Sequence, residues 1–303
     1  MKLKLALGGL LAAALITTPA FAQDVKIGFI TKFPVPFFAT MEDGARAAAE
    51  EIGGVEVIFG QGTSATDIEG QIALIESMVT QGVQGIAITP VDPTVASALD
   101  RAIEEGVKIV LMDNNIPDWE GRTALATTDN YAAGVIAGEY LATRLNDGDT
   151  LGILEGVPGV PALDDRVNGM LEGLGDVNVE IVGRGATNCT EELGINVAED
   201  ILTANPDVTA IYSACGPSAA GAAQAIDNAA LDHHVILVGF DFCCGEEEAL
   251  KSGTEDATVA QFPFNMAKYG VEALISSIKG EEVESLIDSG AALVTADNMA
   301  DFM

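Results

Sequence analysis

The sequence predicts an α/β protein with two similar Rossmann-like lobes, parallel sheets and a ligand cleft between the lobes. Short β-branched runs alternate with longer helical patterns along its 303 residues, which is typical of βαβ units. The strand-like runs that contain positions 27, 55 and 85 are each matched by a similar run 124 residues later, at 151, 179 and 209. Two similar lobes in one chain leave a cleft, and clefts between lobes are preferred ligand sites.

Four strands are expected in each half of the chain. In the first half they cover residues 26–30, 55–59, 85–89 and 108–112. In the second half they cover residues 150–154, 179–183, 209–213 and 235–240. The fourth strand of each half is followed by an aspartate, Asp113 or Asp241, although the spacing between the halves has grown to 128 residues there. This symmetric pair of aspartates is the first candidate for a ligand site.

Helices are expected between these strands. One of them carries apolar residues at the helical spacing from Ile68 to Val79. Two others have a proline, Pro93 or Pro217, in the first turn, where the missing N–H is not needed. The four helices are predicted at residues 38–52, 65–81, 93–106 and 217–230.

The loops that follow the strands are expected to face the cleft, because ligands of open α/β sheets bind beyond the carboxyl ends of the strands. In the first half this rule nominates residues 32–38, 60–66, 89–92 and 113–115. In the second half it nominates residues 155–166, 186–192, 214–218 and 241–244.

The nominated loops have a chemical character that suits a polyol or sugar. Such a ligand needs groups that donate to or accept from hydroxyls, and flat apolar faces for its C–H surfaces. The hydrogen-bonding candidates are Asp113, Asn114, Asn115, Arg166, Asp241 and, at a later position, Gln261. The flat faces are those of Phe33, Phe37 and Phe38. We therefore predict a site for a small, neutral, hydroxyl-bearing molecule.

The amino terminus has the features of a secretory signal peptide. Two lysines precede an apolar run from Leu5 to Ile16, and Ala20-Phe21-Ala22 supplies the small residues of a cleavage site. We expect residues 1–22 to be removed and the mature chain to begin near Gln23. Because no cysteine follows the cleavage site, a lipid anchor is not expected. No later stretch approaches the roughly 20 apolar residues of a membrane helix, so the expected product is soluble and exported.

The chain is strongly acidic. Its formal net charge of −32 becomes −34 when the two lysines of the signal peptide are removed. Such a surface repels nucleic acid and anionic lipid, so nucleic-acid binding is excluded as a function. We expect the acidic runs Glu246 to Glu248 and Glu281 to Glu282 to lie on solvated faces.

All four cysteines lie in the second half, and each follows a predicted strand end. They are Cys189, Cys215, Cys243 and Cys244. Disulfides persist in exported proteins, and four cysteines allow three pairings. We favour bridges from Cys189 and Cys215 to the two members of the Cys243-Cys244 pair. The alternatives are a vicinal Cys243–Cys244 bond with a Cys189–Cys215 bond, or a metal site. The only histidines, His233 and His234, lie before the fourth strand, far from the cysteines.

Two other classes of protein fit the sequence poorly. An enzyme needs a nucleophile with a base, or a metal with an open coordination position. The sequence has no G-x-S-x-G motif and no phosphate-binding glycine loop. A transcriptional regulator on the same two-lobed core would begin with a helix-turn-helix, where this chain has a signal peptide. We therefore expect a binding protein and not an enzyme.

At these positions the sequence resembles the periplasmic sugar-binding proteins of the ribose-binding type (the type 1 periplasmic binding protein fold), which deliver substrates to ABC importers. The resemblance covers nearly all of the mature chain. It is carried by Pro36-Phe37-Phe38, Asp43-Gly44, Met112-Asp113-Asn114, Thr128-Asp129-Asn130 with Gly134, Val238-Gly239-Phe240-Asp241 and Ala260-Gln261-Phe262-Pro263. It implies a periplasmic monomer without a cofactor, whose partners are a small neutral sugar or polyol and an inner-membrane ABC permease. A chemoreceptor or a sensor kinase is the alternative partner.

The resemblance also assigns roles. Phe37 and Phe38 are expected to stack on the sugar, and four polar residues, Asp113, Arg166, Asp241 and Gln261, to bind its hydroxyls. The family's hinge has three chain crossings, which fall here near Thr128, Gln261 and Asp288. The expected N-terminal lobe is then 23–128 with 262–288, and the expected C-terminal lobe is 129–261 with 289–303.

Departures from the ribose pattern indicate a different ligand. Val35 replaces the usual Asn before the Pro-Phe-Phe motif, and Cys189 falls where the family has an aromatic residue. Three further family positions are changed but stay candidates for ligand binding, namely Thr89, Asn114 and Cys215. Lys32 resembles the lysine that arabinose-binding relatives place on their sugar, and it is a candidate for that reason.

Overall fold

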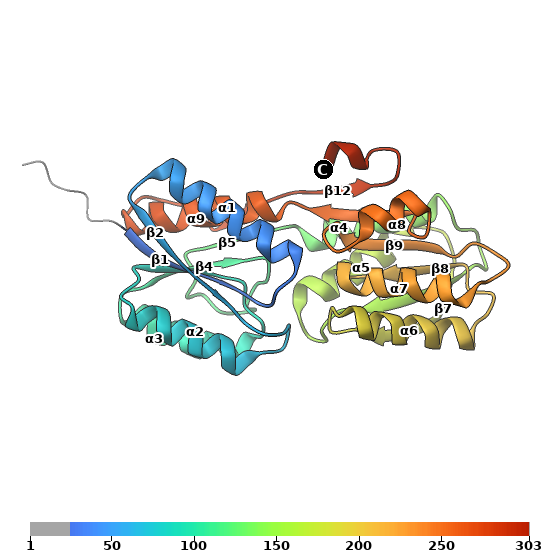
Figure 1. Ribbon diagram of the computed structural model, residues 1–303, viewed down its shortest axis with the longest axis horizontal. Coiled ribbons are helices and arrows are strands. Elements are labelled where there is room, and N and C mark those ends of the chain that lie inside the picture. Colours follow the sequence, from blue (N-terminus) through green and yellow to red (C-terminus); the bar gives the residue numbers. More distant parts are fainter. Residues whose placement is uncertain (1–24, 303) are drawn as a thin grey trace, which may run out of the picture.

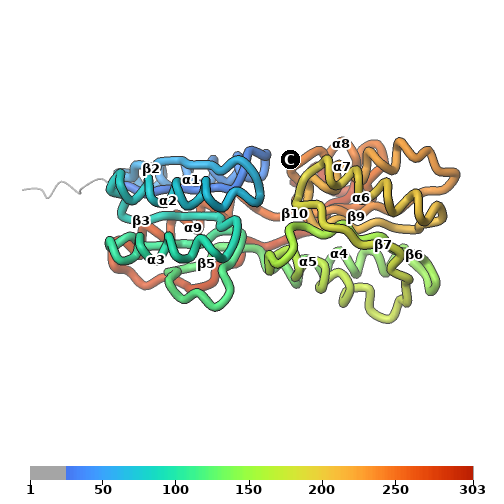
Figure 2. The backbone as a smooth tube through the Cα atoms, turned by 90° about the horizontal axis from the view of Figure 1, so that it is seen from below, coloured from blue at the N-terminus to red at the C-terminus, as the bar shows by residue number. Residues whose placement is uncertain are grey.

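The computed structural model describes residues 25–302 and contains two α/β lobes that lie end to end (Figures 1 and 2). Each lobe has a six-stranded sheet with helices on both faces, which confirms the predicted fold class. The expected signal peptide, residues 1–22, lies outside the described residues. No described helix combines the length and the apolar character that a bilayer-spanning segment requires.

The first lobe is built on an all-parallel sheet. Its strand order is β2 (Val55–Gln61), β1 (Val25–Thr31), β3 (Gly85–Ile88), β4 (Lys108–Met112), β5 (Ala124–Thr127) and β11 (Leu286–Asp288). One face of the sheet packs against α1 (Pro36–Ile52) and α9 (Pro263–Ile278). The other face packs against α2 (Ile68–Thr80), a 3-10 turn η1 (Pro93–Val95) and α3 (Ala96–Glu104). Figure 1 shows these two helical layers above and below the sheet.

The second lobe repeats this topology. Its strand order is β7 (Glu180–Ala186), β6 (Thr150–Glu155), β8 (Ala210–Ser213), β9 (Ile236–Asp241), β10 (Ala257–Gln261) and β12 (Ala291–Val294). One face packs against α4 (Asn130–Ala142) and α5 (Pro161–Gly173), and the other against α6 (Glu191–Ala204) and α7 (Gly216–Ala229). A short helix α8 (Glu246–Ser252) and a 3-10 turn η2 (Met299–Phe302) complete the lobe. Only the sixth strand differs in direction, because β12 is antiparallel to β10.

All eight predicted strands are present, and the ends of the helices have local causes. Helix α2 begins at Ile68, three residues later than predicted, because the Asp67 side chain caps it by accepting from the Gly70 N–H. Helix α1 begins at Pro36, two residues earlier than predicted. It ends at Ile52, because the next residue, Gly53, has a φ of 71° that other amino acids rarely adopt. The strands β5, β10, β11 and β12 were not predicted.

Helices α4 and α5 approach each other unusually closely, which brings the side chain of Arg166 to the end of the sheet. A Cβ at Gly134 would lie 2.3 Å from the carbonyl oxygen of Arg166, and one at Gly169 would lie 2.1 Å from that of Tyr131. Neither distance is possible for a larger residue without moving the backbone. Glycine at these two positions therefore fixes the separation of the helices and the position of Arg166.

The chain passes between the two sheets three times, and the three passages run side by side. They follow β5, β10 and β11. The first and third are joined by hydrogen bonds, since the Ser289 N–H donates to the Thr127 carbonyl at 2.8 Å and the Thr128 hydroxyl donates to the Gly290 carbonyl at 3.2 Å. The second is paired with the third through Gln261 and Ala291. The second passage, at Gln261, lies directly beside the cavity described below.

Candidate functional site

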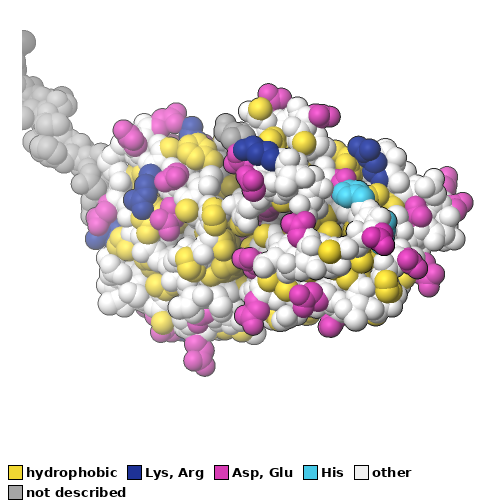
Figure 3. Space-filling view, turned by 45° about the vertical axis from the view of Figure 1, so that its right-hand side comes forward, with side chains coloured by type: hydrophobic (Ala, Val, Ile, Leu, Met, Phe, Trp, Pro, Cys, Tyr) yellow, Lys and Arg dark blue, Asp and Glu magenta, His cyan; other side chains and the backbone are white. Residues whose placement is uncertain are grey.

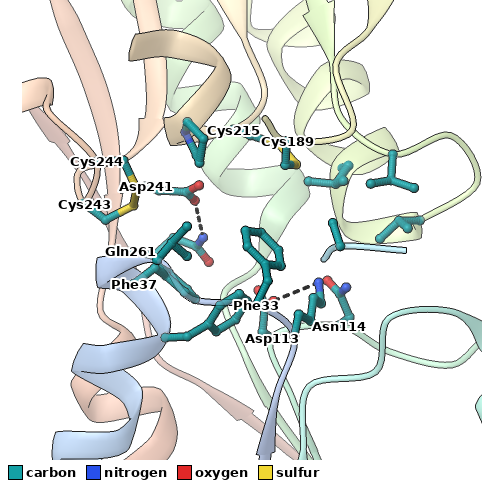
Figure 4. Close-up of a pocket in the computed structure, with 18 of the residues that line it drawn as sticks. Phe33, Phe37, Asp113, Asn114, Cys189, Cys215, Asp241, Cys243, Cys244 and Gln261 are labelled. Carbon is teal, nitrogen blue, oxygen red and sulfur yellow. Dashed lines mark hydrogen bonds and ion pairs between the residues drawn. A yellow bond between two sulfur atoms is a disulfide. The ribbon is translucent and has the colours of Figure 1, made fainter. Parts of the chain in front are cut away.

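A cavity lies between the lobes, at the carboxyl ends of strands from both sheets (Figure 4). Its volume is about 60 Å³, which is room for about four to six water molecules and therefore for one small ligand. The first lobe contributes Lys32, Phe33, Val35, Phe37, Phe38, Ala65, Val91, Asp113 and Asn114. The second contributes Val157, Val160, Leu163, Arg166, Cys189, Cys215, Pro217, Asp241, Cys243 and Cys244, with Gln261 at the passage between the lobes.

The polar wall of the first lobe is an ion pair. Lys32 follows β1 and Asp113 follows β4, and the Lys32 Nζ lies 3.4 Å from the Asp113 Oδ2. Only 12% and 7% of these side chains are exposed. Burial lowers the pKa of Lys32, and the Asp113 carboxylate opposes that shift. The neighbouring Asn114 is held by its side-chain N–H, which donates to the Pro90 carbonyl at 3.2 Å.

The polar wall of the second lobe is a network around Arg166 on α5. Its Nη1 donates to the Asp241 Oδ1 at 3.1 Å and to the Ala214 carbonyl at 2.9 Å, and its Nε donates to the Asn130 Oδ1 at 2.8 Å. The Gln261 amide donates to the same Asp241 oxygen at 2.6 Å (Figure 4). The guanidinium also lies 4.0 Å from the centre of the Phe240 ring. Arg166 is therefore held rigidly on several sides.

The aspartates of the predicted symmetric pair share an uncommon backbone conformation. The φ angle is 63° at Asp113 and 88° at Asp241, a region that residues other than glycine seldom adopt. Strain of this kind is concentrated at functional sites. Asp241 is also stabilised from behind, because its Oδ2 accepts from the Gly216 N–H at the start of α7, at 2.9 Å.

Three phenylalanines form the apolar side of the first lobe. The rings of Phe33 and Phe37 each lie edge-on to the ring of Phe38, with centroids 5.3 Å apart in both pairs. Phe37 and Phe38 are buried, whereas Phe33 is partly exposed and lies in the middle of the cavity view (Figure 4). The cluster offers a ligand a rigid aromatic surface.

The disulfide pairing differs from the one we favoured. Cys189 is bonded to Cys215, and Cys243 is bonded to its neighbour Cys244. The loop after β7 brings Cys189 to the start of α7, where its Cα lies 5.5 Å from that of Cys215, a normal separation for a bridge. This is the second of the predicted pairings. Both disulfides line the cavity.

Two candidate residues, Thr89 and Asn115, do not line the cavity, and several lining residues were missed. Thr89 is fully buried behind it, and its carbonyl accepts from the side chain of Gln71 at 2.9 Å. Because β3 ends at Ile88 and the chain then turns, Val91 takes the lining position instead. Other apolar lining residues come from nominated loops, namely Val157, Val160 and Leu163. The position of these residues in a loop after a strand could have indicated them. Their aliphatic side chains, however, do not distinguish a binding site from a protein core.

The site is electrically balanced within a strongly acidic surface. Acidic side chains are spread over the molecular face in Figure 3, with few basic ones among them. The cavity, in contrast, holds two cations, Lys32 and Arg166, and two anions, Asp113 and Asp241. A ligand with a net charge would upset this balance, so the geometry favours a neutral molecule.

Two glutamates are buried behind the second-lobe wall, and one of them departs from the sequence prediction. Glu246 was expected on a solvated face, yet it and Glu255 are each only 1% exposed. Burial, with a smaller effect from Asp241, raises the pKa of Glu246 to about 7, while the N–H of Cys244 partly offsets this by donating to its carboxylate. Burial and then the charge of Glu246 raise the pKa of Glu255 well above its ordinary value.

Comparison with known proteins is consistent across sequence and structure. A family profile described as the periplasmic binding protein domain matches residues 27–282. The chain is 30% identical over 271 residues to the D-ribose/D-allose-binding protein of Pseudomonas aeruginosa, which covers 86% of this chain and 85% of that protein. It is 28% identical over 274 residues to the ribose import binding protein of Salmonella typhimurium, with coverage of 90% and 91%.

A solved structure shows the same likeness. An ABC transporter solute-binding protein of Agrobacterium vitis, crystallised with bound D-fucose, superposes with a TM-score of 0.86 at 28% sequence identity. The match covers 90% of this chain and 96% of that one.

Proposed function

The chain belongs to the periplasmic binding protein family, and on that premise we propose that it captures a small neutral sugar or polyol between its lobes and delivers it to an ABC importer. The similar proteins named above are sugar-binding or import-binding proteins, which supports both parts of the proposal. The family is one of binding proteins, which confirms the expectation that the chain is not an enzyme.

The observation that carries the proposal is the combination of groups in the cavity. Aromatic rings, forked donors and carboxylates converge on one small space whose charges cancel. Hydroxyl groups can donate and accept at once, and the C–H faces of a sugar can lie on Phe33 and its neighbours. Each hydrogen bond to a charged group contributes roughly 1.5–3 kcal/mol, so a few suffice for selectivity.

Binding is proposed to close the lobes. The residues assigned to the ligand are Lys32, Phe33, Phe37, Phe38, Asp113 and Asn114 from one lobe and Arg166, Cys215, Asp241 and Gln261 from the other side. A ligand that contacts both sides binds the closed arrangement more tightly than the open one. The difference between these two affinities sets how far the equilibrium shifts toward closure. The proposed lobes are 23–128 with 262–288 and 129–261 with 289–303. They would rotate about the three passages, since hinged closure is a known motion of periplasmic binding proteins.

The proposed setting is the periplasm, because the matching family is described as a periplasmic binding protein domain. Residues 1–22 would act as the export signal, and the mature protein would act as a monomer without a lipid anchor. Its second partner would be the membrane permease of the importer.

The proposal is tested with a ligand panel and a pair of lysine variants. Thermal shift with pentoses, hexoses, deoxy sugars and polyols should find at least one ligand, and calorimetry should then give its affinity. Lys32→Met should weaken binding at least tenfold, because the Asp113 carboxylate then faces the ligand without its counter-charge.

The matched control is Lys26→Met. Lys26 pairs with Glu56 on the surface at 3.5 Å, away from the cavity, so this variant should bind as the wild type does. Failure of every neutral sugar and polyol to bind would reject the proposed function.

A further inference from the structure

The lining of the cavity is more apolar than a fully hydroxylated sugar requires. Of its twenty residues, only six carry a polar or charged side chain, namely Lys32, Asp113, Asn114, Arg166, Asp241 and Gln261. The other fourteen are aromatic, aliphatic or disulfide-bonded. Building on the proposed function, we propose that the ligand is a hydroxyl-poor sugar, such as a deoxy sugar, whose apolar part lies against the two disulfides.

Most of the polar capacity of the site is already used within the protein. Asp241 accepts from Arg166 and Gln261 on one oxygen and from the Gly216 N–H on the other. Three of the donors on Arg166 and one on Asn114 also have protein partners. Each sugar hydroxyl brings a donor of its own, which needs an acceptor when it is buried.

The unused acceptors are few. Among the described side chains that line the cavity, the oxygens without a protein partner are the second carboxylate oxygen of Asp113, the Oδ1 of Asn114 and the Oε1 of Gln261, which is buried. So few free side-chain oxygens favour a partly deoxygenated sugar over a fully hydroxylated hexose. Most of the remaining lining is carbon or sulfur, against which a buried hydroxyl would lose its hydrogen bonds.

The two disulfides form part of the apolar wall of the cavity. All four cysteines line the cavity, and Figure 4 shows both bridges on the second-lobe side, with Phe33 and Phe37 on the first-lobe side. Oxidised sulfur has no S–H to donate and is at most a weak acceptor, while its polarizability suits contact with aromatic or aliphatic groups. Bridges that only stapled the fold would not need to converge on the ligand space.

The aliphatic residues continue this surface. Val157, Val160 and Leu163 form one cluster with Cys189 and Cys215, so the Cys189–Cys215 bridge is continuous with the valines and leucine. Cys243 packs against the cluster that contains Phe37 and Phe38. The apolar surface therefore runs from one lobe to the other around the polar groups, and a methyl group of the ligand would find carbon or sulfur on several sides.

The first experiment compares sugars that differ by one hydroxyl. D-Fucose and D-galactose form one such pair, and 5-deoxy-D-ribose and D-ribose form another. Calorimetry on the wild-type protein should show the deoxy member of at least one pair binding at least tenfold more tightly. Equal or tighter binding by the hydroxylated members, or binding by fully hydroxylated sugars and polyols alone, would overturn the inference while leaving the proposed function intact. Loss of binding across the whole panel would reject both.

The second experiment tests the sulfur wall with matched double variants. Cys243→Ala with Cys244→Ala and Cys243→Ser with Cys244→Ser both remove the vicinal bridge, but only the second pair adds hydroxyls. The alanine variant should keep the ratio of affinities that favours the deoxy sugar. In the serine variant this ratio should fall at least threefold. The same preference in both would show that the bridge does not set specificity.

A single substitution covers the case in which these double variants do not fold. Val157→Thr adds one hydroxyl to the same apolar surface at almost constant volume. It should reduce the preference for the deoxy sugar as well. An unchanged preference in this variant would contradict the apolar surface as the determinant.

Discussion

Glu246 and Glu255 show at the scale of single residues how burial changes the chemistry of a group. Neither has a basic partner within residues 25–302, and the Oε1 of Glu246 and both carboxylate oxygens of Glu255 lack a hydrogen-bond partner there. An ionised carboxylate is costly in such a place. Protonation removes that cost, which is why the pKa of each is raised.

The first residue-scale prediction concerns pH. The pKa of Glu246 is about 7 in the folded protein and near 4.5 when unfolded. The folded state therefore holds a proton that the unfolded state has released between these values. The stability from this group is full below about pH 4.5 and is lost as the pH rises to 7, by about 3 kcal/mol. Glu246→Gln cannot ionise, so urea unfolding should show it gaining stability over the wild type by that amount between pH 4.5 and 8.

Glu248→Gln is the control, because Glu248 lies on the same helix and is exposed. It should follow the wild-type pH dependence. A Glu246→Gln variant that did the same would show that Glu246 does not titrate in this range.

The second residue-scale prediction concerns Arg166. Arg166→Met keeps much of the stem volume but leaves Asp241 buried without its counter-charge, which typically costs about 3–5 kcal/mol. Adding Asp241→Asn removes the unpaired charge and should recover part of that loss in urea unfolding. Arg101→Met breaks an exposed pair with Glu76 and should cost at most about 1 kcal/mol. If the double variant loses as much free energy of unfolding as the two single variants together, then Arg166 and Asp241 are not coupled.

The candidate site residues could be predicted where their residue type and position in the sequence are distinctive. Asp113 and Asp241 stand at repeated strand ends, and charged or aromatic loop residues are conspicuous in a sequence. Burial of Glu246 was not predictable, because a run of three glutamates normally lies in water. The position of Thr89 depended on one turn after β3, which the sequence pattern does not determine.

At the scale of elements, the β-branched runs predicted the central strands because these strands are buried on both faces. The burial of β3 and β8 is complete along their length. The edge strands β11 and β12 are only three and four residues long and partly exposed, so they lack that pattern. The sequence also cannot encode which loops meet, and this is why the favoured disulfide pairing was wrong.

The element-scale prediction compares the two disulfides. The Cys189–Cys215 bridge spans 26 residues and ties the loop after β7 to α7, whereas the Cys243–Cys244 bridge spans one. A bridge stabilises mainly by restricting the unfolded chain, and a loop of this length is worth about 3–4 kcal/mol. Replacing Cys189 and Cys215 by alanine should therefore lower the free energy of unfolding by about that amount. The same replacement of Cys243 and Cys244 should cost much less, and equal losses would contradict the chain-entropy account.

At the scale of the whole molecule, the two lobes share one strand order but are joined by three adjacent passages. The passage after β5 is hydrogen-bonded to the one after β11, and Gln261 on the remaining one also donates to Asp241 in the site. The site and the passages are therefore in direct contact. A ligand that contacts Asp241 would therefore be linked to the passages through one side chain, that of Gln261.

This connection leads to the last prediction, which is that ligand binding makes the molecule more compact. The two walls of the cavity belong to different lobes, so a ligand can satisfy both only when the lobes approach. Small-angle scattering should show a smaller radius of gyration with saturating ligand than without it. Lys32→Met, with one wall impaired, should show the change only at a higher ligand concentration. If the wild-type radius is the same in both states while calorimetry shows binding, then the lobes do not move and the cavity is filled as it stands.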